Sequence, residues 1–318
     1  MPDLVTGIAK AYLGLLPARP SEEYFHPDQI SEAAALARAR AEFEDERQGG
    51  FSRLFQESCE GAGGIILDLG CGFGGRTVEF QRRTAGYVLG LEIDSKVGRF
   101  AKKFAESMGV ADIDFVTGVG ESLPFAADSI DLIFSYDVFE HVQSPEMCFR
   151  ECFRVLKPGG TLMSVFPPYF HPTGAHLEGY VSRMPYSNLI FPSPVLVRAI
   201  EEILEERGDS FRPHPLRQGD KLHSLNGLTI RRFNRIVRDT GFEAVSIRLL
   251  PLFSEANRNY RTWRMQYYAW AFKLLPRMPV VRECFTHRVV SVLRKPGRGA
   301  QEVSGRIDSE EVLINRRG

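Results

Sequence analysis

The sequence of 318 residues has no run of about 18 consecutive apolar residues, the length at which a segment becomes a candidate membrane-spanning helix. Its first residues lack the basic and then apolar segments that mark a secretory signal peptide. Lysine plus arginine and aspartate plus glutamate both number 40, so the net charge is zero and the chain has no overall bias toward nucleic acid. We therefore expect a cytoplasmic protein.

Cysteine is scarce, and no two cysteines have the Cys-x-x-Cys spacing of a zinc site. The five cysteines are also odd in number, which fits a reducing compartment better than a disulfide framework. Cys148 and Cys152 lie four residues apart on a predicted helix, a spacing that suits buried thiols. The sequence therefore predicts no metal site, and its length is sufficient for a large apolar core.

Residues 65–75 read IILDLGCGFGG and are the most informative segment of the chain. The apolar run Ile65–Leu69 predicts a buried strand, the next glycines predict a turn, and Arg76–Thr84 predicts a helix. Glycine permits a positive φ and lets a ligand approach the backbone without meeting a Cβ atom. A strand, a glycine turn and a helix in this order bind nucleotides at the carboxyl ends of strands in open α/β sheets.

Two details distinguish this turn from a dinucleotide-binding fingerprint. Asp68 lies two residues before the first glycine, where it would repel a pyrophosphate but suits a ligand that carries an ammonium group. The glycines Gly70, Gly72 and Gly74 alternate, and Gly75 adds no further helix-packing step of the G-x-x-G kind.

The pattern Asp-x-Gly-x-Gly-x-Gly resembles motif I of the class I S-adenosylmethionine (SAM)-dependent methyltransferases, in particular the type 11 small-molecule group. Four further segments follow in the family's order: Tyr87–Asp94, Phe115–Phe125, Ser129–Val142 and Arg154–Leu162. The resemblance implies a methyltransferase that uses SAM as its methyl donor. The donor-binding positions that it implies are Asp68, Gly70, Cys71, Gly72, Phe73, Gly74, Glu92, Ile93, Val119, Gly120, Glu121 and Tyr136.

The resemblance assigns two of these regions to parts of the donor. Glu92 matches the acid that binds the ribose hydroxyls, although it is also explained as a surface acid at a strand end, and Asp94 is expected to cap the next helix. Val119 replaces the Asp or Asn that usually contacts adenine. Glu121, or backbone groups at Val119 and Gly120, would then take that role.

The resemblance also implies an α/β fold, a doubly wound and mostly parallel seven-stranded sheet, over residues 61–295. Residues 1–60 are predicted to be a helical N-terminal extension, in which Ser31 caps a helix over Ala33–Arg47 that either covers the SAM pocket or is a solvated outer helix. The polar tail 296–318 is expected to be disordered.

Two insertions interrupt the family pattern. Residues 167–228 are rich in proline and histidine, contain a predicted helix over Val195–Glu206, and follow the fifth strand on the acceptor side. Residues 250–286 contain the basic and aromatic stretch Arg261–Val281 between the two last strands. Residues of this stretch that share one helical face are Trp263, Tyr267, Trp270, Ala271 and Leu274. That face either packs on the domain or on a second subunit, or lies in a membrane interface.

Methyl transfer from a sulfonium is an in-line displacement, so the protein mainly supplies alignment and excludes water. A hydroxyl acceptor also benefits from a base, and histidine is the common choice. The candidates are His141 after the fourth strand and His171 and His176 after the fifth, with structural roles as the alternative. Tyr136 and Phe73 are positioned either to face the sulfonium or to pack in the core.

The sequence favours a methyltransferase for a small-molecule acceptor, with oxygen as the first choice of acceptor atom. One alternative is a lipid-linked or glycan substrate at a membrane surface, reached through peripheral contact of residues 261–281. The other is a methyltransferase-like protein without catalytic activity. A nucleic-acid substrate is not expected, because Phe166-Pro-Pro-Tyr169 lacks the leading Asn or Asp of amino-methylating enzymes. A homodimer is compatible with the aromatic stretch.

Overall fold

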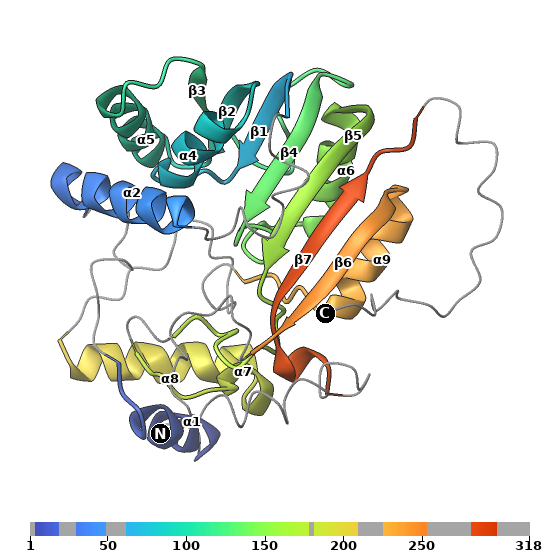
Figure 1. The fold of residues 1–318 in the computed structure, drawn as a ribbon. Coiled ribbons are helices and arrows are strands. Elements are labelled where there is room, and N and C mark those ends of the chain that lie inside the picture. Colours follow the sequence, from blue (N-terminus) through green and yellow to red (C-terminus); the bar gives the residue numbers. More distant parts are fainter. Residues whose placement is uncertain are drawn as a thin grey trace.

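The computed structural model describes residues 4–18, 30–48, 62–177, 181–208, 225–252 and 281–297. A seven-stranded sheet with the order β3-β2-β1-β4-β5-β7-β6 forms its centre (Figure 1). The strands are β1 (Ile65–Leu69), β2 (Tyr87–Glu92), β3 (Ile113–Thr117), β4 (Ile130–Tyr136), β5 (Leu156–Phe166), β6 (Glu243–Pro251) and β7 (Thr286–Arg294). Only β7 runs antiparallel to its neighbours β5 and β6. The predicted α/β class and the mostly parallel seven-stranded sheet are therefore confirmed.

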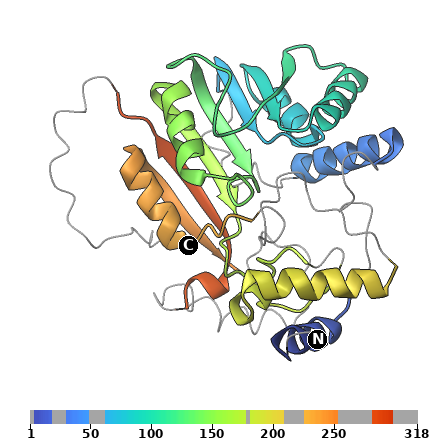
Figure 2. The same cartoon turned by 180° about the vertical axis from the view of Figure 1, so that it is seen from behind.

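Helices cover both faces of this sheet (Figures 1 and 2). The helices are α1 (Leu4–Gly14), α2 (Glu32–Arg47), α4 (Gly75–Arg83), α5 (Ser95–Ser107), α6 (Pro145–Val155), α7 (Ser187–Ile190), α8 (Ser193–Glu206) and α9 (Ile230–Thr240), with the 3₁₀ helix η7 (Glu283–Phe285). Alternate residues of β4 point to opposite faces. Leu132 and Phe134 join the core under α2, α4 and α5, whereas Ile133 joins the core under α6 and α9.

Local capping signals define several helix ends, among them the starts after Ser31 and Asp94 that the sequence predicts. Ser31, Asp94 and Ser144 each accept hydrogen bonds from backbone N–H groups in the first turns of α2, α5 and α6. Gly241 ends α9 in the left-handed region, with φ 86°. The fifth strand begins at Leu156, where it pairs with Ile130 of β4, and the register shifts before Thr161 pairs with Leu132.

The residues before β1 do not form one unit. Helix α2 packs on α4 and α5 beside the sheet, whereas α1 packs on α8 of the acceptor-side insertion, away from the sheet (Figure 1). The contact between α1 and α8 has its own apolar core, in which Ala9 and Leu13 meet Leu196 and Ile200. Residues 4–18 thus complete the insertion.

Two sequence-based expectations fall outside the described residues. Of the aromatic and basic stretch Arg261–Val281, only Val281 is described, and of the tail 296–318 only residues 296 and 297 are described. The helix expected in the first and the disorder expected in the second therefore stay predictions. Within the described ranges, no helix has both the length and the apolar character required to cross a bilayer.

Candidate functional site

The glycine turn joins β1 to α4 at the carboxyl ends of the parallel strands. Gly70, Gly72 and Gly74 have φ values of 77°, 53° and 81°, which favour glycine over all other residues. The N–H groups of Gly70 and Cys71 donate to the carbonyl oxygen of Leu91 at 2.8 and 3.1 Å. These two bonds fix the start of the turn to the end of β2.

The three alternating glycines have different surroundings. A Cβ atom at Gly70 would lie 2.3 Å from Cγ2 of Val138, and one at Gly74 would lie 2.8 Å from Cβ of Ala101. A Cβ atom at Gly72 would meet no atom within 4 Å. Packing therefore requires the first and third glycines, whereas the second borders open space that a ligand can enter.

Gly75 has a packing role, so the expectation that it adds no such step is wrong. A Cβ atom there would lie 2.1 Å from the carbonyl oxygen of Ala39 and 2.7 Å from Cβ of Glu42. Both neighbours belong to α2. The fourth glycine therefore lets α2 pack closely against the start of α4.

Glu92 at the end of β2 binds the backbone of the turn. Its Oε2 accepts a hydrogen bond from the N–H of Gly72 at 3.0 Å, and its Oε1 accepts from the N–H groups of Ile93 and Asp94 at 2.9 and 3.2 Å. Burial raises the pKa of this carboxyl, and the three backbone donors oppose that shift. Glu92 thus fixes the backbone of the turn at Gly72, the glycine that borders open space.

Asp68 is a buried carboxyl with 3% of its surface exposed. The hydroxyl of Thr77, in α4, donates to Oδ2 of Asp68 at 2.7 Å. Burial raises the pKa of Asp68 to about 7, and the bond from Thr77 opposes this shift. The side chain therefore changes charge near neutral pH, and a cationic ligand nearby would favour its ionised form.

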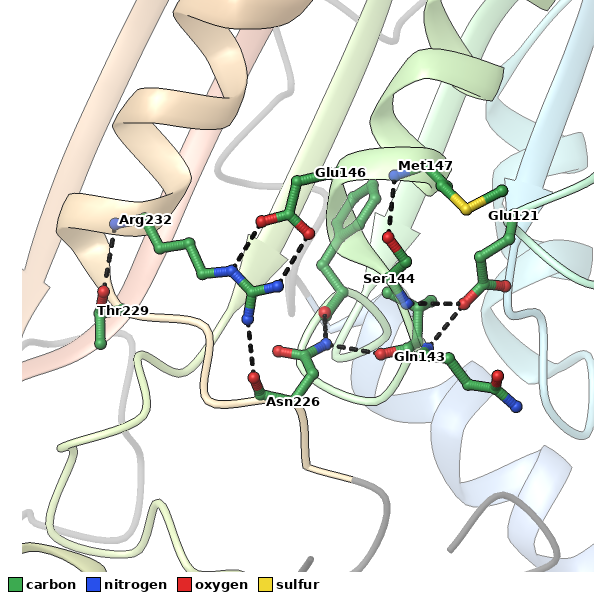
Figure 3. Close-up of polar contacts among 10 residues, drawn as sticks. Glu121, Gln143, Ser144, Glu146, Met147, Asn226, Thr229 and Arg232 are labelled. Atoms are coloured by element: carbon green, nitrogen blue, oxygen red, sulfur yellow. Dashed lines mark hydrogen bonds and ion pairs between the residues drawn. The ribbon is translucent and has the colours of Figure 1, made fainter. Parts of the chain in front are cut away.

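In the region expected to bind adenine, the side chain of Glu121 is hydrogen-bonded within the protein, whereas that of Val119 is exposed. Oε1 of Glu121 accepts hydrogen bonds from the backbone N–H groups of Gln143 and Ser144 at 2.6 and 3.2 Å (Figure 3). This carboxylate therefore fixes the chain just before α6, in addition to any role toward a ligand. Val119 keeps 39% of its surface exposed, and a Cβ atom at Gly120 would lie 2.7 Å from Sγ of Cys148.

Asn226 clamps the loop that follows β4. Its Nδ2 donates to the carbonyl oxygens of Phe139 and Val142 at 2.6 and 2.8 Å. The backbone carbonyl oxygen of Asn226 accepts a hydrogen bond from the guanidinium of Arg232. The same guanidinium forms a bidentate ion pair with Glu146, in which both bonds are 2.8 Å long (Figure 3). Nothing in the local sequence marks this clamp, since Asn226 and Arg232 contact residues 84–87 positions earlier in the chain.

The three predicted histidines separate into two pairs. The rings of His141 and His176 lie 5.1 Å apart, whereas Nε2 of His171 lies 3.1 Å from Nδ1 of His287 in β7. Nδ1 of His171 accepts from the N–H of Thr173 at 3.2 Å, so we assign the ring proton of His171 to Nε2, which donates to His287.

Both histidines of the pair between His171 and His287 have lowered pKa values. Burial lowers the pKa of His171 well below its ordinary value, with smaller contributions from Arg288 and His287. Burial and Arg288 lower the pKa of His287 to about 3. His171 has both ring nitrogens engaged inside the protein, which suits a structural role. His141 and His176 remain the candidates for contact with an acceptor.

Glu140 lies beside His141 and is 3% exposed. Neither of its carboxyl oxygens has a hydrogen-bond partner among the described residues, and Oε1 lies 3.9 Å from Nε2 of His141. Burial raises the pKa of Glu140 well above its ordinary value, and the nearby Asp137 adds to the shift. Asp137 itself pairs with Arg288 at 3.2 Å. A buried carboxyl without hydrogen-bond partners is costly in its charged form, which is the physical cause of the raised pKa.

The two predicted aromatic positions each face a cation of the protein. The guanidinium of Arg76 lies 4.2 Å from the ring centre of Tyr136, and that of Arg38 lies 5.1 Å from the ring centre of Phe73. Within the described chain, no group of three or more His, Cys, Asp or Glu side chains is arranged to hold a metal ion.

Residues 67–164 match the family described as "Methyltransferase domain". A sterol 24-C-methyltransferase of Pneumocystis carinii is 35% identical over 103 residues, which cover 32% of this chain and 27% of that protein. The chain thus matches about a quarter of the length of such relatives. The ubiquinone/menaquinone biosynthesis C-methyltransferase UbiE of Vibrio vulnificus is 29% identical over 216 residues, 64% of this chain and 75% of that protein.

Two solved structures share the fold. One is a chain of the complex between the Haloferax volcanii Trm112 methyltransferase activator and a methyltransferase, with a TM-score of 0.52, 16% identity, and coverage of 83% of this chain and 97% of that chain. The other is the Haemonchus contortus phosphoethanolamine N-methyltransferase 2, with a TM-score of 0.50, 14% identity, and coverage of 84% of this chain and 58% of that chain.

Proposed function

We propose that this chain, which contains a class I SAM-dependent methyltransferase domain, transfers the donor's methyl group to a small-molecule acceptor. One observation carries the proposal: the turn at Gly72 borders open space, and the carboxylate of Glu92 lies bonded to the backbone N–H of that glycine. This pair of features at the carboxyl ends of β1 and β2 suits a nucleoside ligand.

The residues around the turn fit the parts of SAM. An ionised carboxylate offers about four lone-pair positions, and the described bonds occupy three of those of Glu92. Oε2 therefore keeps a position for a ribose hydroxyl. Asp68, near the turn, favours the positive charge of the donor's ammonium group, and residues 119–121 line the side expected to take adenine.

The donor supplies an activated methyl group when it is bound, and the residues of this chain align the acceptor and exclude water. For an oxygen acceptor, His141 is the proposed base, because it lies on the loop after β4 and is a third exposed. Its neighbour Glu140 lies 3.9 Å from its Nε2, too far for a direct hydrogen bond. The base would take the hydroxyl proton as the oxygen attacks the methyl carbon.

A carbon acceptor is the second candidate for the reacting atom. The names of the sterol and UbiE relatives both specify C-methyltransferases, and this shared chemistry favours it. An assay that compares phenolic acceptors with activated carbon acceptors, with the product identified by mass spectrometry and NMR, would separate the two.

Binding of S-adenosylhomocysteine to Glu92→Ala tests the proposed site. Loss of one charge-assisted hydrogen bond and a disturbed turn should weaken binding about tenfold or more, which corresponds to roughly 1.5–3 kcal/mol. Calorimetry would measure the affinity, and Glu106→Ala on the far end of α5 is the matched control. Unchanged affinity in Glu92→Ala, or a comparable loss in Asp94→Ala alone, would contradict the assignment.

A further inference from the structure

A cavity of about 610 Å³ lies apart from the glycine turn, between α9, α7 and η7. In Figure 2 the orange helix α9 stands above the short red segment that contains η7. The apolar part of the cavity wall is formed by Phe170, Leu189 and Ile230. The functional site described above uses none of these residues.

Among the described residues that line this cavity, four are arginines and one is a carboxylate, Glu283. Arg231, Arg235 and Arg238 follow one another at helical spacings of four and three residues, so they share one face of α9. Arg282, just before η7, adds a fourth guanidinium. Within the described ranges, none of these arginines forms an ion pair, and like charges at such spacings repel one another.

The carboxylate in the wall does not neutralise these arginines. Oε1 of Glu283 accepts the N–H of Phe170 at 2.9 Å, and Oε2 accepts the N–H of Ile230 at 3.1 Å. Both oxygens therefore bind backbone groups, one of them at the first residue of α9. Burial raises the pKa of Glu283, which further weakens it as a counter-charge.

Two buried polar atoms of the wall have no partner among the described residues. These are Nε of Arg282 and Oδ1 of Asn234. A guanidinium donor that is buried without an acceptor is costly, and no group of the described residues neutralises Arg282. The amide of Asn234 can present its oxygen or, after a flip, its NH₂ group to a ligand in the cavity.

We propose that this arginine-lined cavity binds the diphosphate group of an organic ligand. Guanidinium groups bind phosphate oxygens in bidentate fashion, which makes arginine the preferred partner. Arg231 and Arg238 are separated by seven residues, or about 10 Å of helix, a span that suits two linked phosphates better than one. The apolar wall formed by Phe170, Leu189 and Ile230 receives the organic part. This binding activity is additional to methyl transfer.

Calorimetry on the full chain with inorganic pyrophosphate, inorganic phosphate and sulfate at equal ionic strength tests the proposal. Pyrophosphate should bind more tightly than the other two anions. The double variant Arg235→Gln/Arg238→Gln should weaken pyrophosphate binding at least about tenfold, because two charge-assisted contacts are lost. The control Arg198→Gln, an exposed arginine on α8, should leave it unchanged.

Binding of farnesyl diphosphate distinguishes a diphosphate that is part of an organic ligand from a free diphosphate. Tighter binding than that of pyrophosphate supports a ligand whose apolar part contacts the cavity wall, and equal binding supports a free diphosphate. S-adenosylhomocysteine affinity, measured on the same variants, shows that they are folded and tests the donor site separately. Pyrophosphate binding no stronger than that of sulfate, or unchanged binding in a folded double variant, would overturn the proposal.

Discussion

At the scale of single residues, Asp68 links the donor site to stability. Its ordinary pKa of 3.8 is raised to about 7 in the folded protein, chiefly by burial. Between these two values the folded chain holds a proton that the unfolded chain has lost. The protonated carboxyl of Asp68 therefore contributes to the free energy of unfolding at low pH. This contribution is lost as the pH rises through about 7.

Asp68→Asn should remove this pH dependence, since asparagine stays neutral and can still accept from Thr77. Its stability relative to the native chain should rise by about 2–3 kcal/mol between pH 5 and pH 8. Urea denaturation at several pH values measures this difference. The same variant should bind S-adenosylhomocysteine more weakly at pH 8. A stability difference that is constant with pH would show that Asp68 does not titrate in this range.

His141→Ala tests the proposed base. With an oxygen acceptor, turnover should fall by about 10²–10⁴-fold, while affinity for S-adenosylhomocysteine stays within a factor of about two. His171→Ala is the informative comparison, because removal of a buried ring bonded to His287 should lower the melting temperature instead. Full turnover in both His141→Ala and His176→Ala would mean that transfer proceeds by alignment alone.

The residues that sequence reasoning identified and those that it missed differ in a physical way. Gly70, Gly72 and Gly74 are recognisable because a positive φ leaves a local mark, namely glycine at fixed spacing. His287 and Asn226 act through contacts with residues 116 and 84–87 positions away, and nothing in their local sequence marks them. For Glu140, the sequence shows an acid beside His141, but its burial without a partner is visible only in the fold.

At the scale of helices and strands, capping side chains made the boundaries predictable. Asp94 accepts from two N–H groups at the start of α5, and Thr229 accepts from the N–H of Arg232 at the start of α9. Such bonds join residues two or three apart, so the sequence contains the whole signal. The start of β5 at Leu156 depends on pairing with β4, which local sequence does not contain.

Gly75→Ala should separate α2 from α4. The new Cβ would overlap the carbonyl oxygen of Ala39 at 2.1 Å, and a backbone oxygen cannot rotate away as a side chain does. We expect destabilisation of about 1–3 kcal/mol or more, measured by urea denaturation. Gly7→Ala is the control: it lies in α1 with no atom within 4 Å of the new Cβ, and should be neutral or stabilising by about 0.5–1 kcal/mol. Equal stability of the two variants would refute close packing at Gly75.

At the scale of the whole molecule, the alternation of strands and helices predicts a mostly parallel sheet, but it does not predict the separate apolar core between α1 and α8. Lys10 of α1 pairs with Glu202 and Glu206 of α8 at 3.1 and 2.6 Å, beside the apolar contact of the two helices. These helices lie almost 200 residues apart, so only the folded chain brings them together. Residues 4–18 thus stabilise the acceptor-side insertion.

The aromatic and basic stretch Arg261–Val281 bears on whether the acceptor is a small molecule or a lipid-linked or glycan substrate at a membrane surface. Two tryptophans, Trp263 and Trp270, share one predicted helical face with Tyr267 and Leu274, and Arg264 and Lys273 lie between these positions. A face of this kind must be buried against the domain, against a second subunit or in a membrane interface.

Co-sedimentation with anionic vesicles separates these choices. If the stretch contacts a membrane, the protein should sediment with vesicles at about 0.1 M salt and be released at about 1 M, because screening shortens the reach of its basic residues from roughly 10 to 3 Å. Trp263→Ser/Trp270→Ser should then remain in the supernatant while it still binds S-adenosylhomocysteine. Neutral vesicles are the control for charge. A native protein that stays in the supernatant at both salt concentrations would exclude the membrane-surface alternative, and the acceptor would then be a molecule that reaches the site by diffusion through water.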